Sequence, residues 1–143
     1  MESFWNKDYE PSFSSDICSF LQSKFSDIEF YPERISLRFP AVTVFQNNKR
    51  EQRVFLDGTI EECYFFTIIV PYGGEDGKAS DGAYWLLDKC LSLCEASDGF
   101  ELGRGGISFK YFCRTENPSK YSRSVTGEDR YSAEIKMCVE RKV

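Results

Sequence analysis

The residues able to do chemistry in this chain are few, because none of its 143 residues is histidine. Histidine is the side chain that most often transfers protons near neutral pH, and it is a common zinc ligand. Its absence excludes histidine-based catalytic triads and mixed cysteine–histidine zinc sites. Lysine or carboxylate catalysis is not excluded in this way, but no group of residues points to it. We therefore expect no enzymatic activity, no catalytic or cofactor-binding residue and no bound metal.

The segment GGEDGKAS, from Gly73 to Ser80, is the most enzyme-like motif, because it follows an expected strand, precedes an expected helix and contains Gly-Lys. A phosphate-binding P-loop has four residues between its first glycine and the Gly-Lys pair, followed by Ser or Thr to bind magnesium. Here three residues intervene, and Ala79 follows the lysine. Glu75 and Asp76 would also repel phosphate oxygens. Nucleotide binding is therefore disfavoured.

Six cysteines are present, and the N-terminal segment MESFWNKDYEPSF has neither the basic nor the apolar region of a signal peptide. We therefore expect a cytosolic chain with reduced cysteines that pack as small apolar side chains. Cys90 and Cys94 lie one helical turn apart and could hold two positions of a metal site, with further ligands from Cys63, Cys113 or Cys138. Both fall on the apolar stripe of the expected helix, so buried packing is favoured over metal binding.

The adjacent acidic residues Glu61 and Glu62 lie beside an expected hairpin turn. Neighbouring side chains on a strand point to opposite faces, so these carboxylates are not expected to converge as a catalytic pair. A charged strand end that discourages edge-to-edge pairing is the favoured interpretation.

The net charge of −5 is unevenly distributed. Residues 1–33 contain seven acidic and two basic residues, a balance of −5, whereas residues 103–124 contain five basic residues and one acidic residue, a balance of +4. The acidic total and the lack of an RNA-binding signature disfavour nucleic-acid binding. Solvated loops would explain the distribution, and so would two patches suited to head-to-tail association. The candidate protein-interface residues are Arg104, Arg114, Lys120, Tyr121 and Arg123.

The segment RVFLDGTIEECYFFTIIVP, residues 53–71, carries the clearest structural signal. Two β-rich runs flank Asp57-Gly58, which favours a hairpin turn because both residues can adopt positive φ. From Tyr64 onward both faces of the second run are apolar, so we expect helices to cover one face and a second layer or a partner subunit to cover the other. The expected faces are Ile60, Tyr64, Phe66, Ile68 and Val70 on one side, and Cys63, Phe65, Thr67 and Ile69 on the other.

The remaining elements follow from periodicity, which predicts helices from helical spacing and strands from alternation. Their order predicts a single α+β domain over residues 1–143, a mostly antiparallel β-sheet packed with two α-helices. No apolar run approaches the ~18 residues of a membrane span. The predicted elements are a flexible N-terminal arm (1–14), a helix (15–25), a loop to Pro32, a strand (35–39) continuing past Pro40 through 41–45, a loop (46–52), the hairpin ending at Pro71, a loop (73–82), a helix with its apolar stripe from Ala83 to Cys94 that Ser97-Asp98-Gly99 closes, a turn (103–106), a strand (107–113), a long polar loop (114–129) and a final strand (131–140).

Two of these strands have one apolar face each. The expected inward residues are Ile107, Phe109, Tyr111 and Cys113 in the first, with Phe112 on the wetter face, and Tyr131, Ala133, Ile135, Met137 and Val139 in the second.

The order and spacing of these motifs resemble those of the tail terminator proteins of long-tailed phages and prophages, a family also described as minor capsid or tail completion proteins. The acidic N-terminal segment is longer than in the family pattern, and the six cysteines are no part of it. The family offers no catalytic residue to transfer. The resemblance covers about residues 35–143 and is carried by RVFLDGTIEECYFFTIIVP, by the Gly-rich loop and helix from Gly73 to Cys94, by ISFKYFC and by TGEDRYSAEIKMCVERK.

The resemblance implies a structural role, in which α+β subunits form a six-fold ring on the last ring of the tail tube and stop its polymerisation. The implied partners are further copies of the chain, the tail tube protein and the head completion or stopper protein, with no specific nucleic acid, membrane or cofactor. The implied location is the host cytoplasm during assembly and then the head–tail junction of the virion. The charge asymmetry and the polar loop over 114–129 fit a heterologous ring contact, with the loop ordered on assembly.

Two other interpretations stay open. One is another head–tail connector component, a stopper or adaptor, which differs in its partner but not in its chemistry. The other is a cytosolic ligand- or protein-binding module unrelated to phage, with a ligand under the loop over Gly73–Gly82. An enzyme is the least favoured class.

Overall fold

The structure is a computed structural model with two helices and six strands in its described residues, which are 12–34, 40–73, 77–98, 100, 102, 105–121 and 128–142. This content confirms the predicted α+β fold class. The predicted strand over 35–39 and most of the predicted N-terminal arm lie outside the described residues. The elements are α1 (Phe13–Gln22), β1 (Glu29–Pro32), β2 (Ala41–Val54), β3 (Thr59–Gly73), α2 (Gly77–Glu95), β4 (Ile107–Arg114), β5 (Ser119–Tyr121) and β6 (Glu128–Lys142).

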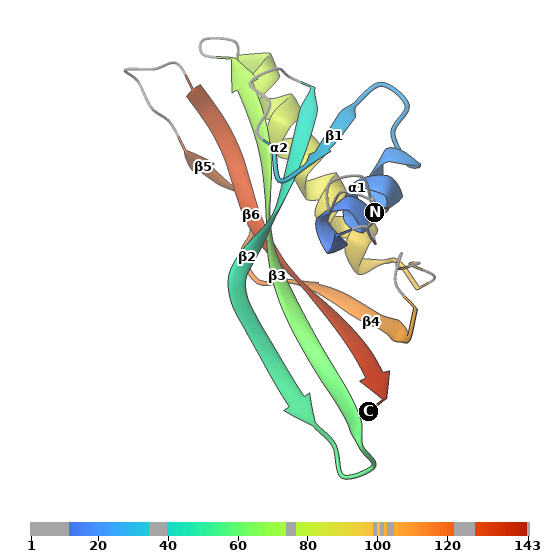
Figure 1. Ribbon diagram of the computed structural model, residues 1–143. Coiled ribbons are helices and arrows are strands. Elements are labelled where there is room, and N and C mark those ends of the chain that lie inside the picture. The colour runs from blue at the N-terminus through green and yellow to red at the C-terminus, as the bar shows by residue number, and fades with distance from the viewer. Residues whose placement is uncertain are drawn as a thin grey trace, which may run out of the picture.

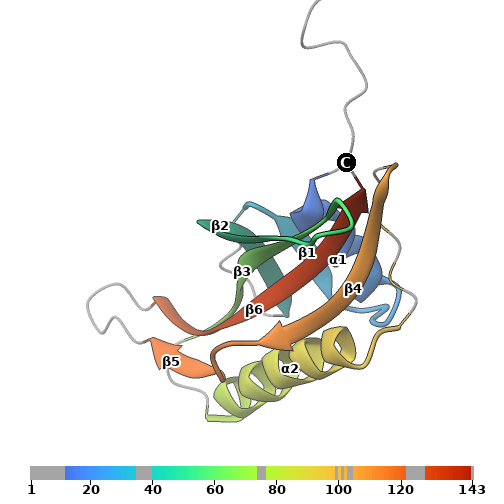
Figure 2. The same ribbon diagram turned by 90° about the horizontal axis from the view of Figure 1, so that it is seen from below.

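The strands form one sheet in the order β1-β2-β3-β6-β4, and the short β5 pairs with the part of β6 that β4 leaves free. β1 and β2 run parallel, and the other described pairs are antiparallel. Both helices pack on one face of the sheet (Figure 1), and α2 runs along β4 and β6 (Figure 2). We call this the inner face and the opposite one the outer face.

The hydrophobic core lies between the inner face and the two helices. Phe66, Ile68 and Val70 of β3 are fully buried there, as the alternation predicts. Each such side chain stabilises the fold by ~1.5–3 kcal/mol relative to exposure. The predicted stripe on α2 is confirmed as well, with Ala83, Leu86, Leu87, Cys90, Leu91 and Cys94 at most 2% exposed.

The β2–β3 hairpin extends beyond the helices and ends in a tight turn (Figure 1). The amide of Gly58 donates to the carbonyl of Phe55 at 3.1 Å, and the amide of Phe55 donates to the carbonyl of Thr59 at 2.8 Å. Gly58 has a φ of 86°, whereas Asp57 is not in the positive-φ region. The turn is therefore the three-residue type, in which one left-handed glycine is enough. The hairpin is confirmed, but only one residue of the Asp-Gly pair takes positive φ.

α1 begins earlier than predicted, because Ser12 caps it. The Ser12 hydroxyl accepts a hydrogen bond from the amide of Ser15 at 3.1 Å, which satisfies one of the free amides of the first turn. Phe25 lies beyond the helix and packs against Phe30 of β1, with ring centroids 5.8 Å apart. β1 itself falls where the sequence predicted a loop, since four residues ending in proline are too few to show alternation.

β2 continues through residues 46–52, so the predicted loop there is wrong. The prediction failed because the Gln, Asn and Lys residues of this segment are typical of loops. Between Gln46 and Arg50 the register with β3 shifts, and three residues of β2 face the single residue Phe65. Extra residues of this kind form a bulge, which bends the strand.

This bulge covers part of the outer face. Nζ of Lys49 lies 4.3 Å from the ring centroid of Phe65, and Phe65 is only 2% exposed although it points away from the helices. Asn47 accepts a hydrogen bond from Thr67 and donates one to Glu134, both at 2.9 Å. We expected a second layer or a partner subunit to cover this face of β3. Part of that face is instead covered by the chain's own β2.

β3 continues past Pro71 to Gly73, although proline was expected to end it. Pro71 still pairs with Arg130 of β6. The last pair between β3 and β2 is Thr43 with Ile69, so the missing amide of Pro71 removes no bond to β2.

Two predicted loops contain regular structure. α2 begins at Gly77, within the predicted loop over 73–82, of which residues 74–76 are not described. The predicted polar loop over 114–129 contains β5, the last residue of β4 and the first two of β6, and its residues 122–127 are not described.

β4 contains a bulge between Phe109 and Tyr111, with Lys110 as the extra residue. A bulge shifts the alternation of a strand by one residue. Phe112 therefore turns inward and is 5% exposed, whereas Tyr111 is 41% exposed. The predicted face that joined Tyr111 and Cys113 to Phe109 is wrong for this reason.

Candidate functional site

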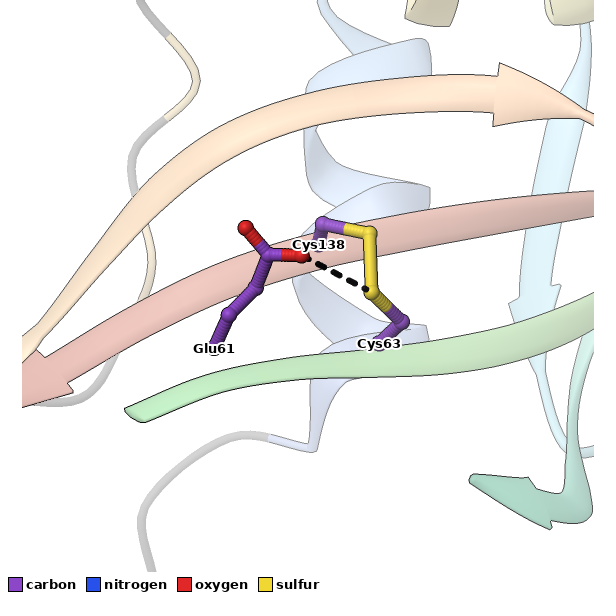
Figure 3. A group of neighbouring side chains, drawn as sticks. All are labelled: Glu61, Cys63 and Cys138. Atoms are coloured by element: carbon purple, nitrogen blue, oxygen red, sulfur yellow. Dashed lines mark hydrogen bonds between the residues drawn. A yellow bond between two sulfur atoms is a disulfide. The ribbon is translucent and has the colours of Figure 1, made fainter. Parts of the chain in front are cut away.

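Glu61 and Cys63 of β3 and Cys138 of β6 meet on the outer face of the sheet (Figure 3). One ligand atom from each residue lies within 4.8 Å of the other two. No other three acidic or cysteine side chains come together in this way in the part of the chain that the structure describes. Cys63 and Cys138 are joined by a disulfide, with their Cα atoms 4.2 Å apart.

The register between β3 and β6 produces this group. Cys63 pairs directly with Cys138, and Glu61 pairs directly with Glu140. Side chains two residues apart on a strand share a face, so these four form a two-by-two block. The short Cα distance of the cysteine pair is typical of non-hydrogen-bonded antiparallel pairs, in which facing side chains lie closest.

Lys110 reaches this block from β4. Its ammonium lies 2.7 Å from Oε2 of Glu61 and 3.5 Å from Oε2 of Glu140. Because Lys110 is the extra residue of the β4 bulge, it can reach across β6 to a carboxylate on β3. The hydrogen bond to Glu61 raises the pKa of Lys110. One cation thus already bridges both carboxylates.

The block is buried at its sulfur end and open at its lysine end. Cys63 is 5% exposed and Cys138 is fully buried. Oε1 of Glu61 lies 3.9 Å from Sγ of Cys63. About a third of the side-chain surface of Lys110 and of Glu140 is exposed, 33% and 34% respectively. Solvent therefore reaches Lys110 and Glu140, whereas Glu61 is only 8% exposed.

The prediction that all six cysteines are reduced is wrong for Cys63 and Cys138. The sequence alternation places both cysteines at outward-facing positions of their strands, and this placement is the signal of their pairing that the sequence offers. Nothing local to either strand fixes a pairing between residues 75 apart in the chain. The interpretation of Glu61 and Glu62 as an edge-protecting strand end is also wrong, because β3 lies between β2 and β6.

Glu62 faces away from Glu61 and has its own partners, which confirms that the two carboxylates do not converge. It accepts hydrogen bonds from the hydroxyl of Tyr64, from Nε of Arg141 at 2.9 Å and from the amide of Gln52 at 3.3 Å. Burial opposes the charged form, but the bonds from Tyr64 and Arg141 lower the pKa of Glu62. This group fastens the end of β6 to the hairpin.

Cys90 and Cys94 lie in the core, as predicted, and Cys18 of α1 lies near them. Burial, with a smaller contribution from Cys18, raises the pKa of Cys90 to about 12. Burial raises the pKa of Cys94 as well. These thiols are therefore protonated at neutral pH and pack as apolar groups.

Arg114, a predicted interface residue, is engaged within the chain. Its Nε lies 2.7 Å from Oε1 of Glu95, its Nη1 lies 2.9 Å from Oδ1 of Asp88, and its Nη2 donates to the hydroxyl of Ser92 at 3.1 Å. Burial opposes its charged form, but the hydrogen bonds to Asp88 and Glu95 raise the pKa of Arg114. The guanidinium joins β4 to α2, so little of its charge is free for a partner.

Lys120 is exposed, and its Nζ lies 5.7 Å from the ring centroid of Tyr72. Tyr121 belongs to β5, and its side chain is not described. Arg104 and Arg123 lie outside the described residues. An interface role for these four residues stays a prediction.

Besides Tyr111, the described residues include two sets of neighbouring large apolar side chains that are exposed. Val54, Phe55 and Leu56 form the hairpin tip, where Leu56 is fully exposed and Val54 is 67% exposed. Tyr84 and Trp85 lie in the N-terminal half of α2 and are 47% and 59% exposed. Both residues lie near the middle of the helix, and the hairpin tip extends away from α2 (Figure 1).

No protein-family model matches the chain, and comparison with curated proteins finds no significant match. Neither described helix is both long and apolar enough to cross a membrane.

Proposed function

We propose that this chain is the tail terminator subunit of a long-tailed phage or prophage. In this role it assembles in the host cytoplasm as a six-fold ring on the last ring of the tail tube, stops tube polymerisation, and becomes part of the head–tail junction. Its partners are further copies of itself, the tail tube protein and the head completion or stopper protein. The role is structural, with no catalytic step.

The observation that carries this function is the exposed hairpin tip. Val54, Phe55 and Leu56 are consecutive, and they stand at the end of an extension that the helices do not cover. Contiguous exposed apolar side chains mark interaction sites, because leaving them in water forgoes their burial energy. Burying Leu56 alone against a partner would contribute ~1.5–3 kcal/mol.

The second exposed set suits a head-to-tail contact. Tyr84 and Trp85 lie near the middle of α2, away from the tip, and aromatic side chains are enriched at interface centres. When a surface meets a different surface of the next copy, closure of the rotation gives a ring. The hairpin tip and a separate pair of exposed aromatic rings on α2 meet this requirement within one chain.

The test is deletion of the gene from its phage or prophage, followed by complementation and negative-stain microscopy of the particles. Overlong tails and filled heads without tails, both corrected by the wild-type chain but not by Leu56→Asp, support tube capping through the tip. The matched control is Asn48→Asp, which adds the same charge at an exposed position of the same hairpin. Tails of normal length detached from heads would move the chain to a joining role in the neck. Intact virions would overturn the proposed function.

A further inference from the structure

We propose that Cys63 and Cys138, once reduced, form with Glu61 and Glu140 a binding site for a thiophilic divalent cation such as zinc. The inference does not rest on the assembly role, because its four ligands all lie on the outer face of β3 and β6.

The first support is the donor set. Two thiolates and two carboxylates on one face give sulfur and oxygen ligands, the kind of set that binds Zn²⁺. The side chains come from adjacent strands in direct register, so the backbone already holds them together. Calcium and magnesium prefer sites made of oxygen alone, which argues against them here.

The second support is distance. Tetrahedral zinc with Zn–S bonds of ~2.3 Å needs donor atoms roughly 3.8 Å apart. Ligand atoms of Glu61, Cys63 and Cys138 lie within 4.8 Å of one another, and Oε1 of Glu61 is 3.9 Å from Sγ of Cys63. The two sulfurs must separate, and breaking their bond frees both side chains to rotate. Glu140 lies outside this group of three, so its side chain must turn toward the sulfurs to become the fourth ligand.

The third support is Lys110, whose ammonium already occupies a cation position. It lies 2.7 Å from Glu61 and 3.5 Å from Glu140, so the two carboxylates converge on one positive charge. The lysine side chain is 33% exposed and flexible, and it can withdraw into solvent when a divalent ion takes its place. The Lys110 ammonium thus competes with the divalent cation for the carboxylates. It also marks the side from which solvent reaches the site.

Formation of the site has two balanced steps. A thiol reductant, two R–SH, transfers two electrons and two protons to the disulfide, which gives two cysteine thiols and one R–S–S–R. The cation then binds as the two thiols become thiolates, and two protons leave to solvent. The disulfide form lacks free thiolates and does not bind the ion.

The experiment is a titration of the full-length, metal-free chain with Co²⁺ and then Zn²⁺ under anaerobic conditions, with and without prior reduction by a phosphine. The reduced chain is expected to bind one Co²⁺ with a thiolate-to-cobalt charge-transfer band, and one Zn²⁺ should displace it. The oxidised chain should show no such band. This comparison uses a single sequence, so it does not depend on whether a variant folds.

Variants locate the site. Cys63→Ser and Cys138→Ser should each remove the band, and Glu61→Gln should weaken binding by about tenfold or more. Cys113→Ser is the matched control, because Cys113 is an exposed cysteine on the neighbouring strand, and it should bind as the wild type does. Lys110→Met should tighten binding by removing the competing cation. A reduced wild type that binds no Co²⁺, or a Cys63→Ser variant that keeps the band, would overturn the inference.

Discussion

The guanidinium of Arg114 lies 2.9 Å from the carboxylate of Asp88, and this contact joins the end of β4 to the middle of α2. Glu95, nearly two helical turns further along, lies 2.7 Å from the same guanidinium. One cation at a strand end therefore holds two carboxylates of a helix in a fixed relation to the sheet.

Arg114→Ala should lower the free energy of unfolding by about 1–2 kcal/mol. Hydrogen bonds to charged groups contribute more than neutral ones, but partial exposure reduces the contribution of ion pairs. Urea denaturation measures the change, with Lys120→Ala as the control, because surface substitutions usually stay within ~0.5 kcal/mol. Equal stability of the two variants would contradict this structural role and return Arg114 to the candidate interface.

Phe66→Ala should lower the free energy of unfolding by about 3–5 kcal/mol, because the ring is fully buried between β3 and the helices and its loss leaves a cavity. The comparison is Tyr111→Ala, which removes an aromatic ring that is 41% exposed. Thermal or urea unfolding by circular dichroism gives both values. A Tyr111 variant as unstable as the Phe66 variant would mean that β4 packs differently around its bulge.

Leu56→Asp should leave the stability of the subunit unchanged and abolish its self-association. The side chain is fully exposed within one subunit, so a carboxylate there costs the fold little, whereas the same charge in an apolar contact is not solvated. Light scattering after size exclusion, over a range of concentrations and with tail tubes added, measures assembly. Asn48→Asp should assemble normally, and unaltered assembly of the Leu56 variant would show that the tip is no interface.

The buried thiol of Cys90 should make the protein lose stability in alkali. The unfolded thiol ionises near its ordinary pKa of 9.0, whereas burial holds the pKa in the folded state at about 12. Above pH 9 the unfolded chain has released a proton that the folded chain keeps, so stability falls as pH rises. The contribution is fully present below pH 9 and is lost between pH 9 and 12.

Between pH 8 and pH 10 this loss should be about 1 kcal/mol for Cys90. Urea midpoints at the two pH values, in the wild type and in Cys90→Ala, isolate the effect, since Cys18 and Cys94 stay in both proteins. The variant should lose less stability over this interval. An equal loss would mean that other groups cause the alkaline effect.

The sequence predicted those parts of the fold that depend on local pattern. The alternation of β6 from Ala133 to Val139 and the apolar stripe of α2 correspond to buried side chains because one packed face determines each pattern. The hairpin followed from Asp57-Gly58, although the turn uses positive φ only at Gly58.

What the sequence did not predict depends on pairing between distant segments. The polar residues 46–52 form a strand because β3 offers partners for them, and no local propensity indicates this. The bulge at Lys110 reverses the faces of β4, and alternation alone cannot place such an insertion. The outer-face group needs the register of β3 with β6, so Cys63 and Glu61 gave no sign of their partners.

The partial cover of β2 by β1 has a consequence for solubility. β1 pairs only with Ala41–Val44. From there to the hairpin tip, no described strand pairs with the edge of β2 that faces away from β3. That side is a ready template for another chain's backbone. It carries Lys49, Arg50, Glu51 and Arg53, all exposed, and charged side chains oppose such edge pairing. These four charged side chains therefore disfavour aggregation through the free edge of β2 that leads to the hairpin tip.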